Sequence, residues 1–110
     1  MAFNAGDVVL VPFPYRDRLA ERTRPAVVIS AQAYNQQGDV ILAAITSHPP
    51  RTATDYALVD WNAAGLQFAS TVRMLIATAA GSRIALQIGR LSDRDWAEVQ
   101  SRVLSVFAWP

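Results

Sequence analysis

An arginine stands directly before one of the most apolar stretches of the chain. Arg24 precedes Pro25, and residues 26–29 form a run rich in β-branched side chains. Proline has no N–H group to give to a ladder, so Pro25 predicts the start of a strand, with Arg24 as the last loop residue at its mouth. A guanidinium held by a rigid element has donors of fixed direction, which suits ligand binding. The alternative is that Arg24 only pairs with a nearby carboxylate.

Hydroxyl groups and an imidazole gather where another apolar run ends. Residues 40–46 carry apolar side chains on both faces, which is typical of a central strand, and two prolines soon end it. Thr46, Ser47 and His48 stand at this end, and Thr46 and His48 project from one face if the strand continues. An imidazole suits proton transfer. The alternatives are an ordinary strand threonine and a solvated loop histidine.

A charged segment between Tyr15 and Thr23 separates the first two apolar runs. Together with Arg24 it holds four arginines and two carboxylates: Arg16, Arg18, Arg22 and Arg24 against Asp17 and Glu21. Long loops in compact domains are often lids or binding segments, and the planar fork of arginine recognises phosphate. The alternative is a solvated hairpin loop whose ion pairs cancel one another.

The composition bounds the class of protein. The 110 residues, 52% apolar and 17% charged, predict one globular domain, 1–110. The net charge of +1 does not by itself announce a nucleic-acid partner, although every basic residue is arginine. The absence of cysteine excludes disulfides, thiolate nucleophiles and zinc–cysteine sites. Without a run long enough to span a bilayer or a signal peptide, we expect a soluble cytoplasmic protein and no membrane partner.

Short strands followed by one helix are the expected elements. Apolar runs and turn residues predict strands at 8–11, 25–30, 40–46, 55–59, 70–77 and 84–91, the last interrupted at Gly89, with a hairpin turn at 35–39. This pattern predicts a mainly β fold with one C-terminal helix, as a small curled antiparallel sheet or barrel that the helix closes on one side.

The helix is predicted to open at Ser92. Ser92 with Asp95 three positions later forms an N-cap pattern, so capping explains the carboxylates of Asp93 and Asp95 better than acid–base chemistry. The remaining side chains divide between a buried stripe and an outer face with i,i+4 ion pairs: Trp96, Val99, Val103, Val106 and Phe107 on the stripe, and Arg94, Glu98 and Arg102 outside.

Several segments, taken in order, resemble the MazF/PemK-like toxins of bacterial toxin–antitoxin pairs. They are GDVVLVPFP (6–14), TRPAVVIS (23–30), AITS (44–47), STVRM (70–74) and IGRLS (88–92), followed by Asp95-Trp96. The resemblance implies an SH3-like barrel, usually a homodimer, that acts as a metal-independent, sequence-specific endoribonuclease without a cofactor and arrests growth. It also implies single-stranded RNA as the substrate and a small cognate antitoxin as the inhibitor.

The same resemblance implies a catalytic pair, which in this chain is Arg24 and Thr46. Some relatives use instead an arginine and an aspartate one residue apart in a later strand, where this chain has Arg73 but Leu75. A carboxylate base is therefore not expected at residue 75. Further candidates for binding the substrate are Arg16, Arg22, Ser47, His48 and Arg73. The 2′-hydroxyl of RNA can itself attack the phosphorus, so the protein would have to supply charge stabilisation and proton transfer.

Two other functions fit the same fold. Gyrase poisons are non-enzymatic relatives that depend on a tryptophan near the C-terminus, and this chain has Trp109 but not their Trp-Gly-Ile ending. A catalytically silent binding module, which would capture an antitoxin, is the third possibility.

Overall fold

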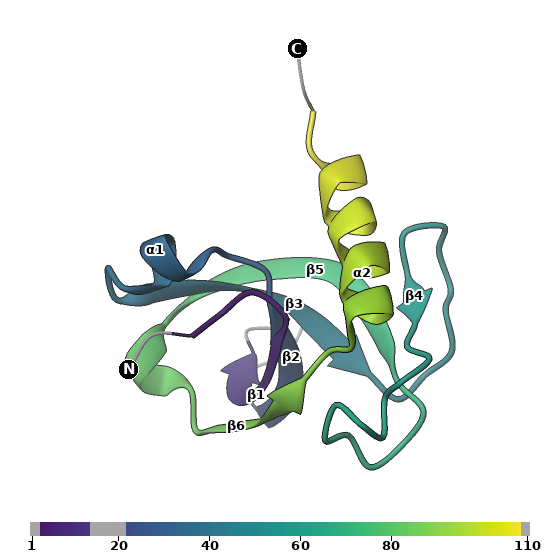
Figure 1. Ribbon diagram of the computed structural model, residues 1–110, viewed down its shortest axis with the longest axis horizontal. Coiled ribbons are helices and arrows are strands. Elements are labelled where there is room, and N and C mark those ends of the chain that lie inside the picture. Colours follow the sequence, from purple (N-terminus) through teal and green to yellow (C-terminus); the bar gives the residue numbers. More distant parts are fainter. Residues whose placement is uncertain (1–2, 14–21, 109–110) are drawn as a thin grey trace.

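One antiparallel sheet makes up most of the fold (Figure 1). The computed structural model describes residues 3–13 and 22–108. Its six strands lie in the order β4-β5-β3-β2-β1-β6. They are β1 (Asp7–Phe13), β2 (Arg22–Val28), β3 (Asp39–Thr46), β4 (Tyr56–Ala57), β5 (Thr71–Ala80) and β6 (Leu86–Arg90), with α1 (Gln32–Asn35), η1 (Gly81–Arg83) and α2 (Asp93–Val106). The predicted mainly β fold with a C-terminal helix is confirmed.

The curled sheet is apolar on both faces. On the face that α2 covers, Ala43 and Ile45 of β3 pack in a buried cluster with Val99 of the helix. On the other face, Leu42 and Ala44 of the same strand belong to a second cluster, formed chiefly by β1, β2 and β3. β3 lies between β5 and β2, as its two apolar faces predicted.

The strand that carries Arg24 begins earlier than predicted. β2 starts at Arg22, so Arg24 and Pro25 lie within the strand and not at its mouth. Pro12, expected to end the first strand, likewise lies within β1. β2 pairs with β1 from Arg22 onward but with β3 only from Ala26. Pro25 therefore lies just outside the hydrogen-bonded ladder between β2 and β3. Proline is tolerated there because no β3 residue requires a backbone N–H from it.

Two turns differ in detail from the prediction. The expected hairpin turn at 35–39 is preceded by the one-turn helix α1, which the sequence pattern did not predict. At Gly89 the backbone of β6 meets the loop after β4, because a Cβ atom there would lie 2.1 Å from the carbonyl oxygen of Ala64. A Cβ on Gly65 would meet Ile88 at the same distance. Glycine at residue 89 thus permits a close backbone approach, but β6 runs through Gly89 without the predicted interruption and shows only a register shift against β1 there.

Helix α2 begins as predicted but buries a shorter stripe. The side chain of Ser92 accepts a hydrogen bond from the backbone N–H of Asp95 at 3.3 Å, and Val99 is fully buried. Val106 and Phe107, predicted as part of the stripe, are 40% and 48% exposed. The reason is visible in Figure 1, where the C-terminal half of α2 projects beyond the sheet. Among the described residues, no helix is long and apolar enough to cross a membrane.

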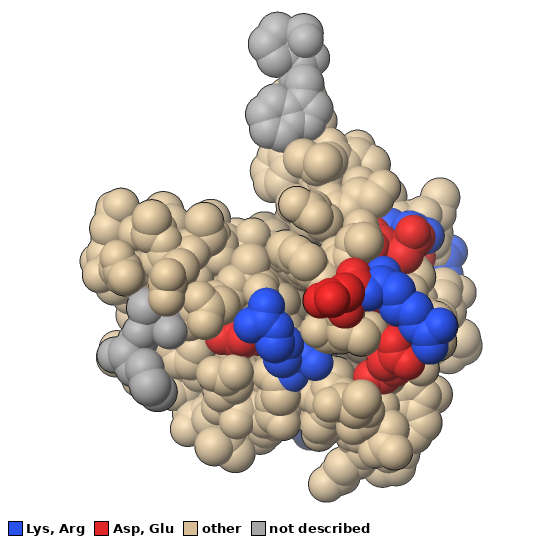
Figure 2. All heavy atoms as spheres, viewed as in Figure 1, with Lys and Arg blue, Asp and Glu red and all other residues tan. Residues whose placement is uncertain are grey.

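The ion pairs of α2 differ partly from the expected ladder. Arg102 pairs with Glu98, as predicted, but Arg94 donates to Asp60 at 2.7 Å from Nη2 and 2.8 Å from Nε. On the face shown in Figure 2, blue and red atoms lie side by side over α2 and the neighbouring loop, in keeping with these pairs. Arg94 reaches Asp60, in the loop after β4, because Arg94 lies in the first turn of α2 and that turn is next to this loop.

Candidate phosphate-binding site

Arg24 and Thr46 project from the same face of two neighbouring strands. β2 and β3 pair with Ala26 opposite Ala44, and Arg24 and Thr46 each lie two residues beyond this last pair. Opposite residues of an antiparallel pair project from one face, and residues two apart in a strand share a face. That face also carries the buried cluster of Ala26 and Ala44, so a rigid core holds both positions. Both side chains are half-buried.

The hydroxyl of Thr46 is fixed at the end of its strand. β3 ends at Thr46, and Oγ1 accepts a hydrogen bond from the backbone N–H of His48 at 3.3 Å. A hydroxyl that accepts one bond still has its own hydrogen to donate. On the other side, Thr71 of β5 lies opposite Thr46 and is only 2% exposed. Thr46 therefore presents a donor on the same face as Arg24, at the edge of the buried cluster.

Arg73 joins the same face from β5. It lies opposite Ala44, two residues from the Thr46–Thr71 pair. Its Nε donates to Oδ1 of Asp55 at 3.3 Å, and its side chain is 30% exposed. Leu75, where some relatives have a carboxylate, packs instead against the apolar cluster of this face. The carboxylate next to Arg73 thus comes from the segment before β4.

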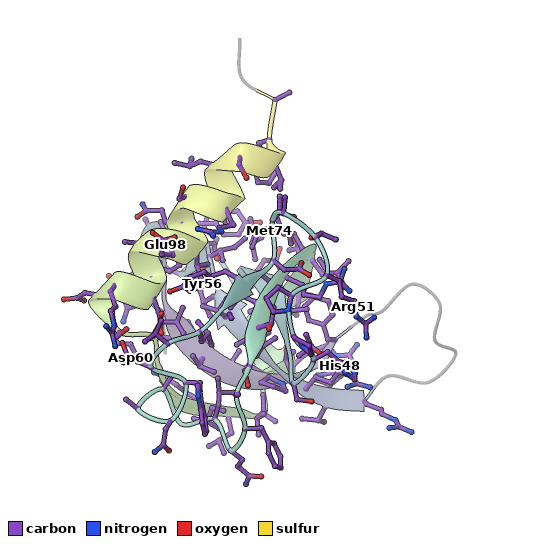
Figure 3. The ribbon with its side chains drawn as sticks, turned by 90° about the vertical axis from the view of Figure 1, so that its right-hand side faces the viewer. His48, Arg51, Tyr56, Asp60, Met74 and Glu98 are labelled. Atoms are coloured by element: carbon purple, nitrogen blue, oxygen red, sulfur yellow. The ribbon has the colours of Figure 1, made fainter. Side chains whose placement is uncertain are left out.

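The remaining candidates occupy the rim or fall outside the described residues. Arg22 is exposed and shares a face with Arg24 by the alternation of strand side chains. Ser47 and His48 are exposed beyond the end of β3, so His48 does not continue the strand. Figure 3 shows His48 on the side of the molecule away from α2, close to the position of Arg51. Arg16 and most of its charged segment lie outside the described residues.

Two residues of this region were missed by the sequence analysis. Asp55 was taken only as the start of the predicted strand at 55–59, and Thr71 only as part of the predicted strand at 70–77. Their proximity to the site depends on strand register, since Asp55 and Arg73 are 18 positions apart. The signal available for Asp55 was its place in a polar loop before an apolar segment, which does not reveal its partner.

The arrangement suits the binding of an anion. Arg22, Arg24 and Arg73 share a face with the hydroxyl of Thr46, and guanidinium groups bind phosphate with two parallel hydrogen bonds. Within residues 3–13 and 22–108, no group of three or more histidine, cysteine, aspartate or glutamate side chains is placed to hold a metal ion.

The sequence matches the family described as PemK-like, MazF-like toxin of type II toxin–antitoxin system over residues 4–107. The chain belongs to this family. No curated protein sequence matches the toxin significantly.

Solved structures share the fold of this toxin. An endoribonuclease in complex with its cognate antitoxin, from a mycobacterial species, matches with a TM-score of 0.80 at 17% identity, over 99% of this chain and 100% of that chain. MazF (Form-I) from Deinococcus radiodurans matches with a TM-score of 0.77 at 25% identity, over 96% of each chain. Mycobacterium tuberculosis toxin MazF-mt6 matches with a TM-score of 0.71 at 18% identity, over 94% of this chain and 99% of that chain.

Proposed function

We propose that this toxin is a metal-independent, sequence-specific endoribonuclease that cuts single-stranded RNA. The observation that supports the proposal is that Arg24 and Thr46 extend from one face of a rigid sheet, each two residues beyond the Ala26–Ala44 pair. The family and the endoribonuclease named among the solved structures support the same activity. The site that contains Arg24 and Thr46 is suited to bind a phosphate, and the phosphate is the group at which bonds form and break during RNA cleavage.

The RNA supplies its own nucleophile in this mechanism. The 2′-hydroxyl oxygen forms a bond to phosphorus as it loses its proton, and the bond from phosphorus to the 5′-oxygen breaks as that oxygen gains a proton. The products are a 2′,3′-cyclic phosphate and a 5′-hydroxyl. Because the attacking and attacked atoms belong to one nucleotide, the protein need not provide the nucleophile.

Arg24 and Thr46 stabilise the charge that develops on the phosphorane. The guanidinium donates to the non-bridging oxygens, and the Thr46 hydroxyl adds a further donor. One such donor is worth about 3 kcal/mol in oxyanion sites. Arginine is a poor base because its pKa exceeds about 12, so its role is electrostatic. His48, two residues after Thr46 in the chain, is a secondary candidate for assisting a proton transfer, because an imidazole suits that role.

The proposed partners follow from the same function. A cognate antitoxin inhibits the toxin, as supported by the mycobacterial endoribonuclease and the Deinococcus radiodurans MazE–MazF pair, which were solved as complexes. The toxin acts as a homodimer in the cytoplasm, where its RNA substrate is found.

Cleavage of a mixed-sequence RNA pool in excess chelator tests the activity. We expect cuts at a defined sequence that leave a 2′,3′-cyclic phosphate, and no cut when the sugar at the scissile position is 2′-deoxy. Cleavage at that deoxy position would rule out attack by the 2′-hydroxyl. Failure to cut RNA, together with inhibition of DNA supercoiling by gyrase, would favour the gyrase-poison alternative. Failure in both assays, with capture of an antitoxin, would favour the silent binding module.

The Arg24→Ala variant tests the site. We expect it to lose activity by about 100-fold or more while it unfolds at an unchanged temperature. The matched control is Arg83→Ala. Arg83 is an exposed arginine of η1, which follows the C-terminal end of β5, whereas Thr71 stands at the N-terminal end of that strand. A folded Arg24→Ala variant with full activity would refute the assignment.

A further inference from the structure

Asp55 is a buried carboxylate at the border of the proposed RNA site. Its side chain is only 2% exposed, although it lies in the loop between β3 and β4. Oδ2 accepts the backbone N–H groups of Arg51 at 2.9 Å and Thr52 at 3.2 Å, and Oδ1 accepts Nε of Arg73 at 3.3 Å. One carboxylate thus holds both the backbone of the loop and the guanidinium of a neighbouring strand.

The bonds to Asp55 favour its ionised form. Burial raises the pKa of the carboxyl group, but hydrogen bonds from Arg51, Thr52 and Arg73 outweigh it and hold the pKa below the usual 3.8. An ionised carboxylate only accepts hydrogen bonds, and its low pKa makes it a weak base. The geometry therefore suits a residue that positions others better than one that takes a proton from RNA.

Arg73 keeps one edge of its guanidinium for another ligand. Asp55 binds Nε, and no described carboxylate accepts from the Nη atoms of Arg73. The two Nη atoms carry donors that match the oxygens of a phosphate. Arg73 lies opposite Ala44, two residues before Thr46 along β3, which corresponds to about 7 Å along the strand. Its guanidinium is thus placed for a phosphate next to the one at Arg24 and Thr46.

We propose that Asp55 is a positioning residue, which fixes Arg73 so that its Nη donors bind the RNA phosphate adjacent to the scissile one. The same carboxylate holds the backbone at Arg51, an exposed arginine three residues after His48 in the chain. Asp55 thereby orders the basic rim of the site from within the protein. The inference rests on the proposed function, since it assumes that the occupant of the face is RNA.

The direction in which a charge-neutralising substitution changes RNA affinity distinguishes this positioning role from a purely electrostatic one. Removing a negative charge near an RNA site should strengthen binding if charge alone matters. A positioning role predicts the opposite for Asp55→Asn, because the amide no longer holds Arg73 by an ion pair. The matched control is Asp39→Asn, which neutralises an exposed aspartate at the other end of β3 from Thr46.

Binding of a mixed-sequence oligonucleotide with 2′-O-methyl at every position, measured by fluorescence anisotropy, provides the readout without cleavage. We expect Asp55→Asn and Arg73→Gln each to raise Kd by about tenfold, and Asp39→Asn to leave Kd within about twofold. The slope of log K against log salt should fall by about 0.7 for both Asp55→Asn and Arg73→Gln, which is the loss of one phosphate contact. Cleavage assays should show KM rising more than kcat falls.

The double variant tests whether Asp55 acts through Arg73. We expect Asp55→Asn to raise Kd by less than about twofold in the Arg73→Gln background, the remaining effect coming from the loop backbone at Arg51 and Thr52. If Asp55→Asn tightens binding, or weakens it equally with and without Arg73, the inference is wrong. Arg73→Gln changes a partly exposed side chain, so it tests the phosphate contact even if Asp55→Asn does not fold, and an unchanged Kd for Arg73→Gln would overturn the inference. A wild-type protein that neither binds nor cuts RNA would instead overturn the proposed function.

Discussion

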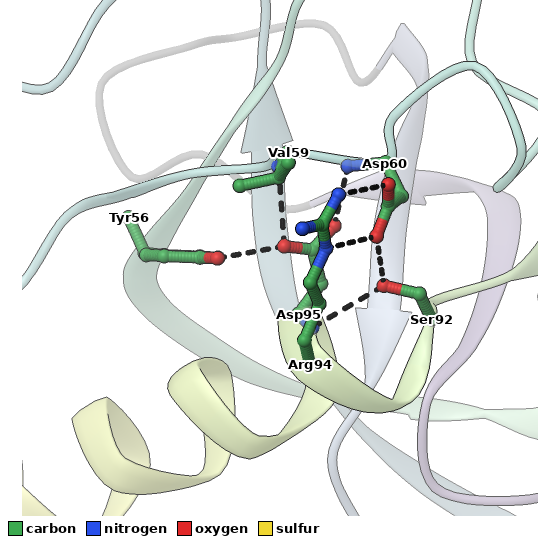
Figure 4. A network of polar contacts seen from close by, with 6 residues as sticks. All are labelled: Tyr56, Val59, Asp60, Ser92, Arg94 and Asp95. Atoms are coloured by element: carbon green, nitrogen blue, oxygen red, sulfur yellow. Dashed lines mark hydrogen bonds and ion pairs between the residues drawn. The ribbon is translucent and has the colours of Figure 1, made fainter.

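The hydroxyl of Tyr56 in β4 donates a hydrogen bond to Oδ1 of Asp95, at the start of α2, at 2.6 Å. Asp95 is fully buried and also accepts the backbone N–H groups of Val59 at 3.1 Å and Asp60 at 2.8 Å (Figure 4). One carboxylate therefore joins the first turn of the helix to the segment that carries β4. The sequence pattern predicted only helix capping for Asp95, whereas its larger role is the attachment of α2 to the sheet.

Replacing Asp95 should destabilise the protein strongly. Asp95→Ala leaves the Tyr56 hydroxyl and two backbone N–H groups without their acceptor in a buried position. We expect the free energy of unfolding to fall by about 3 kcal/mol, measured by urea denaturation. Asp93→Ala, which removes an exposed carboxylate from the same helical turn, should cost less than about 1 kcal/mol. Equal losses for the two variants would contradict the proposed role of Asp95.

Tyr56 should ionise late in an alkaline titration. Burial, followed by the hydrogen bond and charge of Asp95, raises the pKa of Tyr56 to about 12 from its usual 10.0. The unfolded chain loses this proton first, so the stability that the group contributes is complete below its usual pKa and is lost as the pH rises toward about 12. Phenolate absorbance should show a late component that Tyr56→Phe removes. If the variant retains the late component, the assignment to Tyr56 is wrong.

Acid should weaken the protein partly through Asp60. The hydrogen bonds from Arg94 and then Ser92 hold the pKa of Asp60 well below its usual 3.8, against a smaller opposing effect of burial. Because the unfolded state binds the proton more readily, this stability is present above pH 3.8 and is lost as the pH falls toward the folded-state pKa. The urea midpoint of the Asp60→Asn variant should therefore fall less steeply with falling pH than the urea midpoint of the wild type does.

A second variant, Arg94→Gln, tests whether the loss of stability in acid depends on the Arg94–Asp60 pair. Arg94→Gln removes the main cause of the lowered pKa of Asp60, so it should reduce the acid dependence in the same direction as Asp60→Asn. The dependence should not vanish, because the pKa of Asp55 is also lowered. An unchanged acid dependence in Arg94→Gln would contradict the account of this network.

The parts of the fold that could be predicted have local signals. The two apolar faces of β3 follow from alternation within a single strand, and the start of α2 follows from Ser92 and Asp95, three positions apart. Arg24 and Thr46 were singled out from their places beside apolar runs and from a family resemblance, and both project from the face that carries Ala26 and Ala44. Their catalytic roles stay a prediction.

The parts that could not be predicted depend on contacts between distant segments. Asp55 meets Arg73, and Tyr56 meets Asp95, only because the sheet sets which strands are neighbours. The exposure of Phe107 likewise depends on where the sheet ends beneath α2, which helical periodicity does not contain. The spacing of residues in the sequence predicts which side chains share one face of a strand or helix. Which residues they contact depends on the register and length of the neighbouring strands and helices.

The Thr46 hydroxyl should contribute to the reaction more than to RNA binding. Thr46→Val keeps the shape and the strand preference of the side chain, while the exposed N–H of His48 turns to water. If the hydroxyl stabilises the phosphorane, kcat at saturating RNA should fall by about 100-fold, with Kd for a 2′-O-methyl oligonucleotide changed by less than about threefold. Thr46→Ser, which restores the hydroxyl, should recover most of kcat. A Thr46→Val variant with wild-type kcat would remove Thr46 from the mechanism and leave Arg24 as the principal phosphate ligand of the scissile position.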